Sequence, residues 1–410
     1  MIGADAATPP GPGKPVTIVD SGLDITHEEF SSRPNTILLN TQTTIADEDD
    51  HGTEVASVIG APINGLGLVG VYPEAVLRSY DASPDGGITA AAAIRGIEVA
   101  ADRGPGVINI SFGGYGVDPA LEAAIEYAFR RGSLVVASAG NDGMDGNPLS
   151  YPASYPHVLT VGATDMAGAV ADFSSESNFV DLVAPGVAIP VAEPVVDEPS
   201  GYLVGDSAVS GTSFSAPMVS AAAAWVWSER PKLTNTQLFD IMRFSAHDIP
   251  PAGHDRATGW GMLSIPSALS FPAPPPDPLE PNESISEIVR TGLAGGEPPI
   301  TTPARRSTKL LARVDRYEDP DDVYRVFVPA HGSTSATTTG GAVDLRLFPA
   351  TTRSIAGRPA VSSSRPGTTP DHATIRNASG RGVYAYVEVR PGRGTLRASY
   401  TLRVSASARP

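Results

Sequence analysis

Short apolar runs alternate with longer stretches of helical spacing through the first two thirds of the chain. The runs predicted as buried strands are residues 16–19, 75–77, 107–110, 134–137 and 158–161. The stretches predicted as helices are residues 51–60, 89–103, 119–131 and 234–245. Such alternation predicts an α/β fold, a doubly wound and mainly parallel sheet with helices on both faces.

The most apolar stretch, S-G-T-S-F-S-A-P-M-V-S-A-A-A-A-W-V-W at residues 210–227, predicts a short turn followed by a buried helix. Ser213 falls at the start of that helix, and Pro217 falls in its first turn, where a missing N–H costs little. A serine there meets unpaired backbone N–H groups and the positive end of the helix dipole. That position suits chemistry on a developing anion, although an ordinary capping serine is the alternative.

The pattern changes after a proline-dense segment at residues 271–281. Beyond it, runs rich in β-forming residues occupy 323–328, 343–347, 383–389 and 400–404, and Gly, Pro and Ser separate them. They predict a second, smaller all-β sandwich. The predicted division is a domain at 1–270, a linker at 271–281 and a sandwich domain at 282–410.

Charge also divides the chain of 410 residues, whose net charge is −16. Residues 1–276 hold 11 basic and 32 acidic side chains, a net −21, whereas residues 277–410 hold 18 and 13, a net +5. The acidic first part argues against a nucleic acid partner, because phosphates would be repelled. There is no cysteine, which excludes disulfides and thiolate metal sites, and no apolar run long enough to span a membrane.

Three polar residues fall at the ends of predicted elements. Asp20 follows the strand 16–19, His51 begins the helix 51–60, and Ser213 begins the apolar helix. A serine hydroxyl becomes a nucleophile when an imidazole removes its proton, and a buried carboxylate orients that imidazole. One residue of each type is therefore available for nucleophilic catalysis.

The segments V-T-I-V-D-S-G, H-G-T-E-V-A and G-T-S-F-S-A-P resemble the subtilisin family of serine proteases. The resemblance continues through residues 111–114, 139–142, 173–175 and 183–186, and it covers roughly residues 14–265. It implies that Ser213 attacks the peptide carbonyl, His51 moves the proton, Asp20 orients His51, and Asn141 donates to the oxyanion. The order Asp, His, Ser also separates the chain from α/β-hydrolases.

The family resemblance further implies a substrate bound as an extended strand between two edge segments. The first edge is Ser111, Phe112 and Gly113, and the second is residues 84–87 with Gly86. Ser150 and Asp142 fall near the primary specificity pocket. The alternative for each of these is an ordinary loop residue.

Two departures from the family concern charge near the cleft. Glu54 and Ser57 stand where the family usually has histidine and glycine, and an acidic run occupies 47–50. With Asp142, this charge suggests a cleft that prefers basic residues in the substrate. A solvated acidic surface is the alternative.

The resemblance implies no cofactor for the chemistry and a possible structural calcium ion. Its site would comprise the Glu29 carboxylate, the Asn64 side-chain oxygen and the carbonyls of Leu66 and Leu68. Glutamate replaces the family's usual aspartate, and no N-terminal ligand is evident.

The second part resembles the bacterial pre-peptidase C-terminal domain in residues 280–283, 319–324, 343–345 and 400–402. The paired acids within 319–322 either bind calcium or form a charged turn, and the turn is the favoured interpretation. The excess arginine suggests docking on an anionic surface or on the acidic first domain.

These features together predict a secreted, monomeric bacterial endopeptidase in a mature or trimmed form. Two alternatives stay open. Relatives of the same fold transfer the acyl group to an amine and cyclise peptides, and a degenerate copy would be a binding module without catalysis.

Overall fold

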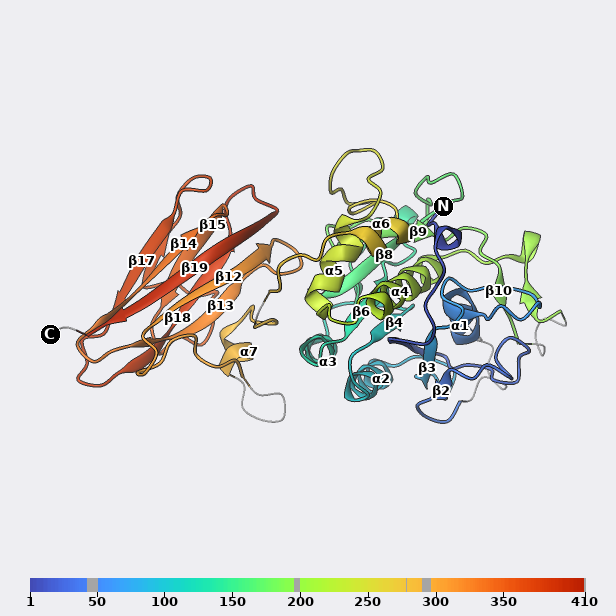
Figure 1. Cartoon of the computed structure of the whole chain (residues 1–410), viewed down its shortest axis with the longest axis horizontal. Coiled ribbons are helices and arrows are strands. Elements are labelled where there is room, and N and C mark those ends of the chain that lie inside the picture. Colours follow the sequence, from blue (N-terminus) through green and yellow to red (C-terminus); the bar gives the residue numbers. More distant parts are fainter. Residues whose placement is uncertain (43–50, 195–199, 278, 290–295, 409–410) are drawn as a thin grey trace. The chain divides into compact units, whose positions relative to one another are not determined.

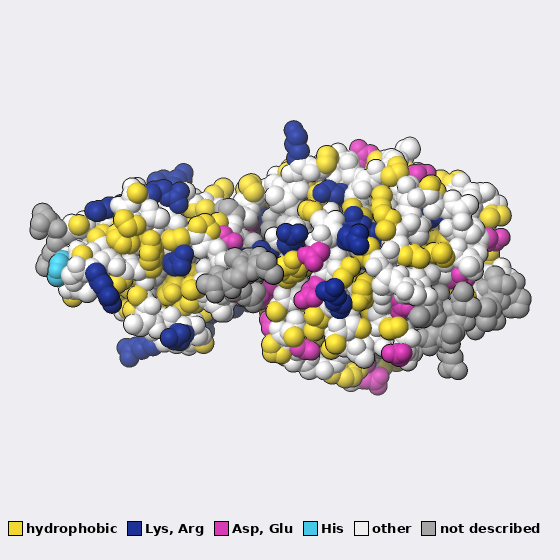
Figure 2. All heavy atoms as spheres, turned by 90° about the horizontal axis from the view of Figure 1, so that it is seen from below, with side chains coloured by type: hydrophobic (Ala, Val, Ile, Leu, Met, Phe, Trp, Pro, Cys, Tyr) yellow, Lys and Arg dark blue, Asp and Glu magenta, His cyan; other side chains and the backbone are white. Residues whose placement is uncertain are grey.

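The computed structural model describes residues 1–42, 51–194, 200–277, 279–289 and 296–408 (Figure 1). It divides into two units, Met1–Pro275 and Pro276–Pro410, and the division falls inside the proline-dense segment. The acidic run at 47–50 lies outside the described residues. On the face drawn in Figure 2, acidic side chains are spread over the first unit, and the second shows mainly basic ones.

The first unit contains a seven-stranded sheet in the order β2-β3-β1-β4-β6-β8-β9, and every neighbouring pair is parallel. The strands are β1 (Pro15–Asp20), β2 (Thr36–Leu38), β3 (Val76–Asp81), β4 (Val107–Ile110), β6 (Leu134–Ser138), β8 (Val158–Thr164) and β9 (Val180–Pro185). This confirms the predicted parallel sheet. Two of its strands were not predicted from sequence, β9 and the short, mostly exposed β2.

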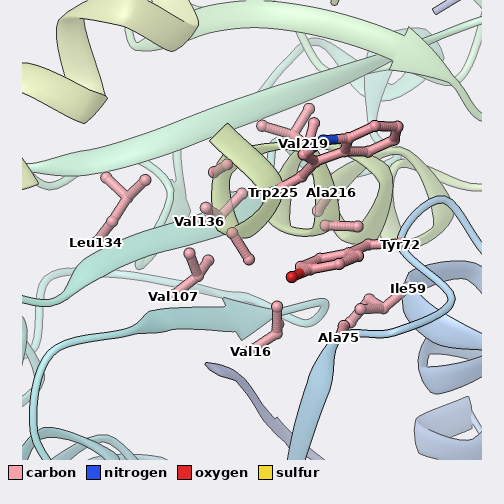
Figure 3. Close-up of a cluster of buried hydrophobic side chains, with 14 of the residues drawn as sticks. Val16, Ile59, Tyr72, Ala75, Val107, Leu134, Val136, Ala216, Val219 and Trp225 are labelled. Carbon is pink, nitrogen blue, oxygen red and sulfur yellow. The ribbon is translucent and has the colours of Figure 1, made fainter. Parts of the chain in front are cut away.

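Helices cover both faces of this sheet (Figure 1). They are α1 (His51–Gly60), α2 (Ala90–Asp102), α3 (Pro119–Arg130), α4 (Thr212–Glu229), α5 (Asn235–Phe244) and α6 (Ile265–Ser270). Alternate β1 residues serve the two faces, because Val16 packs in the core that contains α4 and Val19 in the core that contains α2 and α3. Figure 3 shows Ala216 and Val219 of α4 among Val16, Val107 and other sheet residues. The small alanine side chains let this buried helix approach the sheet closely.

Short elements surround the sheet. Two small antiparallel pairs are β5 (Gly114–Tyr115) with β7 (Ser150–Tyr151), and β10 (Val191–Ala192) with β11 (Tyr202–Leu203). Single 3-10 turns are η1 (Ala4–Ala6), η3 (Gly143–Asp145) and η4 (Gly205–Ser207). Among the described helices, none combines the length and apolarity needed to cross a bilayer.

The second unit is an antiparallel β-sandwich, as predicted. One sheet has the order β12-β19-β14-β17 and the other β13-β18-β15-β16. Their bounds are β12 (Ser307–Asp315), β13 (Asp322–Val328), β14 (Ser333–Thr339), β15 (Val343–Phe348), β16 (Val361–Ser363), β17 (Asp371–Arg376), β18 (Val383–Pro391) and β19 (Arg397–Ser407), and a short α7 (Ile285–Val289) precedes them. Alternate residues of β14 and β19 are buried, which produces one shared core between the sheets.

Candidate active site

Asp20 and His51 are in direct contact. Asp20 ends β1 with 1% of its surface exposed, and its Oδ1 lies 2.9 Å from His51 Nδ1. The same oxygen accepts a hydrogen bond from the Ser21 backbone N–H at 2.9 Å. A carboxylate at Nδ1 assigns the proton to that nitrogen and leaves Nε2 as the acceptor. The structure thus orients the imidazole as a base.

The start of α1 is fixed against the turn that follows β1. The Gly52 N–H donates to Ser21 Oγ at 3.0 Å. A Cβ atom on Gly52 would lie 2.0 Å from the Gly22 carbonyl oxygen, so only glycine allows this close approach. His51 keeps 22% of its side chain exposed, and its ring lies 5.7 Å from that of Phe214, centroid to centroid. The imidazole therefore lies beside the first turn of α4.

Ser213 is the second residue of α4 and precedes Phe214. Its hydroxyl donates to the Ser111 carbonyl at 2.8 Å, and Ser111 Oγ donates to the Ser213 carbonyl at 2.9 Å. These two bonds join the segment after β4 to α4. Attack on a carbonyl carbon requires the Ser213 hydroxyl to turn from Ser111 toward His51, which is a rotation about one side-chain bond.

Asn141 follows β6 and is held by its oxygen. Asn141 Oδ1 accepts from the N–H and the hydroxyl of Thr212, each at 2.9 Å. Its Nδ2 lies 3.4 Å from the position that a Cβ atom on Gly211 would occupy, and it donates to no acceptor among the described residues. The amide N–H₂ is therefore available near Ser213, where an oxyanion would form. The sequence gives Thr212 no role beyond its place in the G-T-S motif, so its contact with Asn141 was missed.

The specificity pocket is expected where two backbone segments, 111–114 and 139–142, both lie close to Ser150. A Cβ on Gly113 would lie 2.3 Å from Ser150 Oγ, and one on Gly140 would lie 3.5 Å from Ser150 Cβ. Ser150 therefore lies close to both segments, and its approach to Gly113 leaves no room for a larger side chain there.

Asp142 also lies close to Gly140. Its Oδ2 is 3.5 Å from the position of a Cβ on Gly140, and its Oδ1 accepts from the Tyr115 hydroxyl at 2.7 Å. The hydrogen bond that Tyr115 donates to Asp142 raises the pKa of Tyr115, which keeps the phenol protonated. Tyr115 had no sequence signal beyond its place after Gly114.

Phe112 and Gly86 differ in exposure. Phe112 is half-buried and packs against the core that contains α2 and α3. Gly86 lies in the exposed segment 84–87 with φ +83°, a conformation that favours glycine. Its role as a second edge for substrate stays a prediction.

The two family departures on α1 have different settings. Glu54 is 9% exposed and follows His51 by one turn. Ser57 donates to the Glu54 carbonyl at 2.6 Å and accepts from the Ala192 N–H at 3.0 Å. The serine therefore ties β10 to the helix that carries His51.

The structure brings together the four residues expected to bind calcium, and hydrogen bonds join them to one another. Glu29 is 1% exposed, and its carboxylate accepts from Asn64 Nδ2 and the Leu68 N–H, both at 2.9 Å. The Asn64 oxygen accepts from the Leu66 N–H at 2.8 Å. The Glu29 and Asn64 oxygens that the expected calcium site requires therefore already accept hydrogen bonds from N–H groups.

A crowded carboxylate cluster lies instead in the second unit. Oxygens of Asp277, Glu280 and Asp319 lie within 4.8 Å of one another. Among the described residues, Glu280 Oε2, Asp319 Oδ1 and Asp322 Oδ1 are buried without a hydrogen-bond partner. Burial and neighbouring carboxylates raise the pKa of Glu280 and of Asp319 well above the usual range. The sequence draws attention to 319–322 but not to Asp277, which stands among prolines with no periodic signal.

Comparison with known proteins agrees with this geometry. The profile of the subtilase family, peptidase S8, matches residues 11–261. Subtilisin of Bacillus pumilus is 34% identical over 259 residues, which cover 62% of this chain and 90% of that protein. Subtilisin amylosacchariticus of Bacillus subtilis subsp. amylosacchariticus is also 34% identical, but the match spans only 65% of its length.

The fold has solved counterparts. The subtilisin-like protease Apa1 from the Antarctic psychrotroph Pseudoalteromonas sp. AS-11 matches with a TM-score of 0.58 at 20% identity, over 66% of this chain and 96% of that one. This likeness supports the fold of the parallel-sheet unit, and the family profile and the relatives add the evidence of sequence. The chain therefore belongs to the subtilase family and is a homologue of the subtilisin serine proteases.

Proposed function

We propose that the protein is a serine endopeptidase. The observation that carries this proposal is the contact of buried Asp20 with His51 beside the first turn of α4, where Ser213 stands. The oriented amide of Asn141 supports it.

In the proposed reaction Ser213 Oγ bonds to the peptide carbonyl carbon while its proton passes to His51 Nε2. The oxyanion is held by Asn141 Nδ2 and the Ser213 N–H, and loss of one such donor costs about 2.7–4 kcal/mol. The C–N bond then breaks as His51 returns the proton to the amine. Water, deprotonated by His51, hydrolyses the acyl-enzyme and restores Ser213. This sequence needs no cofactor.

Labelling with a fluorophosphonate probe tests the nucleophile. Wild-type protein should be labelled at Ser213, and Ser213→Ala should lose the label. Ser207→Ala, at an exposed serine outside the site, should keep it. Equal labelling of the wild type and Ser213→Ala would reject the proposal and favour a binding module.

A second measurement separates hydrolysis from the acyl-transfer alternative. Mass spectrometry of peptide products should show cleaved, water-derived carboxylates. Predominantly ligated or cyclic products would favour a transamidase. We identify no segment among the described residues that would keep water away from the acyl-enzyme, so the measurement has to distinguish hydrolysis from acyl transfer.

We propose that the substrate binds as an extended strand and that the pocket prefers lysine or arginine. The support is Asp142 Oδ2 beside the pocket of Gly113, Gly140 and Ser150. A carboxylate near a partly desolvated pocket attracts a cationic side chain. Hydrolysis of a peptide series varied only at the residue before the scissile bond tests this, and equal rates for lysine and phenylalanine would contradict it.

We propose that structural calcium binds in the second unit. Asp277, Glu280, Asp319 and Asp322 supply hard oxygen donors, and three of these residues carry buried carboxylate oxygens that lack a hydrogen-bond donor among the described residues. A divalent cation would compensate this charge. Calorimetric titration of the full chain with calcium chloride should show binding that Asp322→Asn weakens.

We also propose, from the same resemblances, that the protein is a secreted monomer and that its sandwich is a pre-peptidase-type module. Fractionation of producing cells and gel filtration test the first two points. An intracellular protein or a stable dimer would contradict them.

A further inference from the structure

The loop around Glu29 does not fit the calcium cage that the family resemblance implies. Calcium takes about six to eight oxygen ligands. In this loop the Leu66 N–H fixes the orientation of the Asn64 amide by donating to its oxygen, so that Nδ2 faces Glu29 Oε2. Oε1 is met by the Leu68 N–H. Both carboxylate oxygens thus already hold donors from the loop.

A tyrosine from a distant segment completes the arrangement. The Tyr202 hydroxyl lies 2.6 Å from Glu28 Oε1 and 3.1 Å from Glu29 Oε1. Burial and these two carboxylates raise the pKa of Tyr202, so it stays a donor. Its ring lies on Gly67, where a Cβ atom would be 2.0 Å from a ring carbon. No side chain larger than hydrogen fits beneath that ring.

Buried His27 connects the same segments. Its Nδ1 accepts from the Glu29 backbone N–H at 3.1 Å, which assigns the ring proton to Nε2. Nε2 then donates to the Gly201 carbonyl at 2.7 Å. The Tyr202 ring meets the His27 ring edge-on at 5.3 Å. Residues 27–29, 64–68 and 201–202 are therefore held by protein groups alone.

We propose that these residues, His27, Glu29, Asn64, Leu66, Leu68 and Tyr202, form a metal-independent brace in place of the family's calcium site. The brace anchors the β10–β11 hairpin, whose Ala192 N–H bonds to Ser57 on the helix that carries His51. This proposal does not depend on whether Ser213 is catalytic, because its test measures thermal stability.

The test is thermal unfolding of the full chain carrying Ser213→Ala and Asp322→Asn. These changes remove self-digestion and weaken the cation cluster of the second unit. The Tm of the first unit should be the same in calcium chloride and in chelator. A calcium-induced rise in that Tm that Glu29→Gln abolishes would overturn the proposal.

Two variants in this background probe the brace itself. Tyr202→Phe should lower the Tm of the first unit by about 2–6 °C, equally with calcium and with chelator. The control Tyr127→Phe removes an exposed hydroxyl that bonds to Asp102 and should change it little. Should Tyr202→Phe not fold, Asn64→Ala, which removes the amide donor to Glu29 Oε2, should melt lower. Recovery of that Tm on adding calcium would contradict the inference.

Discussion

The two units differ in how they compensate buried carboxylates. In the first unit, Asp20 contacts an imidazole, Glu29 accepts from loop N–H groups, and Asp181 pairs with Arg243. In the second unit, Asp319 and Asp322 bring buried oxygens together that have no donor among the described residues. Burial of an uncompensated charge is costly, so a cluster of this kind needs protons or a cation. The roles proposed for these carboxylates, in catalysis, bracing and ion binding, therefore differ according to the groups that each one contacts.

The largest effect is expected at Asp20, because we propose that its buried charge takes part in catalysis through His51. Asp20→Asn leaves the shape of the site but removes the charge that holds the His51 proton on Nδ1. We expect kcat to fall about 10⁴-fold with little change in KM. Steady-state hydrolysis of a chromogenic peptide measures it, with circular dichroism to show that the fold is retained. A fall of less than tenfold would remove Asp20 from the proposed triad.

The buried ion pair of Arg243 with Asp181 shows how much a charge partner contributes to stability away from the proposed active site. Arg243 Nε lies 2.9 Å from Asp181 Oδ1, and Asp181 Oδ2 accepts from the Thr160 N–H. Arg243→Met strands a buried charge and should cost about 3–5 kcal/mol of unfolding free energy, a Tm fall on the order of 10 °C.

The control for this pair is Arg95→Ala. Arg95 and Glu98 form an exposed pair at 3.6 Å, whose loss should cost under about 1 kcal/mol. The double variant Arg243→Met/Asp181→Asn should be more stable than Arg243→Met alone, because no buried charge is left unpaired. Equal stability of the two would mean that packing, rather than charge, dominates.

Calcium removal tests the second unit. With calcium at about 100 times its Kd, binding should stabilise the sandwich by about 2.7 kcal/mol, which chelator removes. Differential scanning calorimetry of the full chain should show this shift in one transition only. Asp322→Asn should reduce the shift, and Asp344→Asn, at a carboxylate outside the cluster that accepts from Ser364, should keep it. A calcium-dependent shift confined to the first unit would contradict both the calcium site proposed in the second unit and the metal-independent brace proposed in the first.

The sequence predicted most of the sheet and the pairing of Asp20 with His51, but not these compensating partners. Apolar runs mark strands such as β4 because burial leaves a continuous signal, whereas β14 is largely Ser and Thr and was not assigned. The proposed triad could be assigned from sequence because each member lies in its own motif, and the contact of Asp20 with His51 is confirmed. Thr212 and Tyr115 act through bonds to residues some 70 and 27 positions away, and nothing local indicates such contacts.

The hydrogen bonds within the Glu29 loop were missed for a related reason, and the calcium interpretation of that loop stays a prediction. Glu29 and its loop match the ligand pattern by position, and only the direction of the N–H groups shows that donors surround the carboxylate. Asp277 and Asp319 are 42 positions apart, and folding of the segment before β12 brings them together. The sequence shows where carboxylates lie along the chain, but it does not show which groups contact them in the folded protein.

The smallest effect is expected at Asp142, which is partly exposed and which we propose faces the substrate. Asp142→Asn should lower the ratio of kcat/KM for lysine over phenylalanine substrates about tenfold, or ~1.4 kcal/mol. The change should lie mainly in the lysine substrate, because only its charge met the carboxylate. Tyr115→Phe removes the hydrogen bond that holds Asp142 in position and should reduce the ratio less, by a few fold. Asp145→Asn, a nearby exposed acid without that contact, should leave it unchanged, and an equal effect there would reassign selectivity to the general negative field.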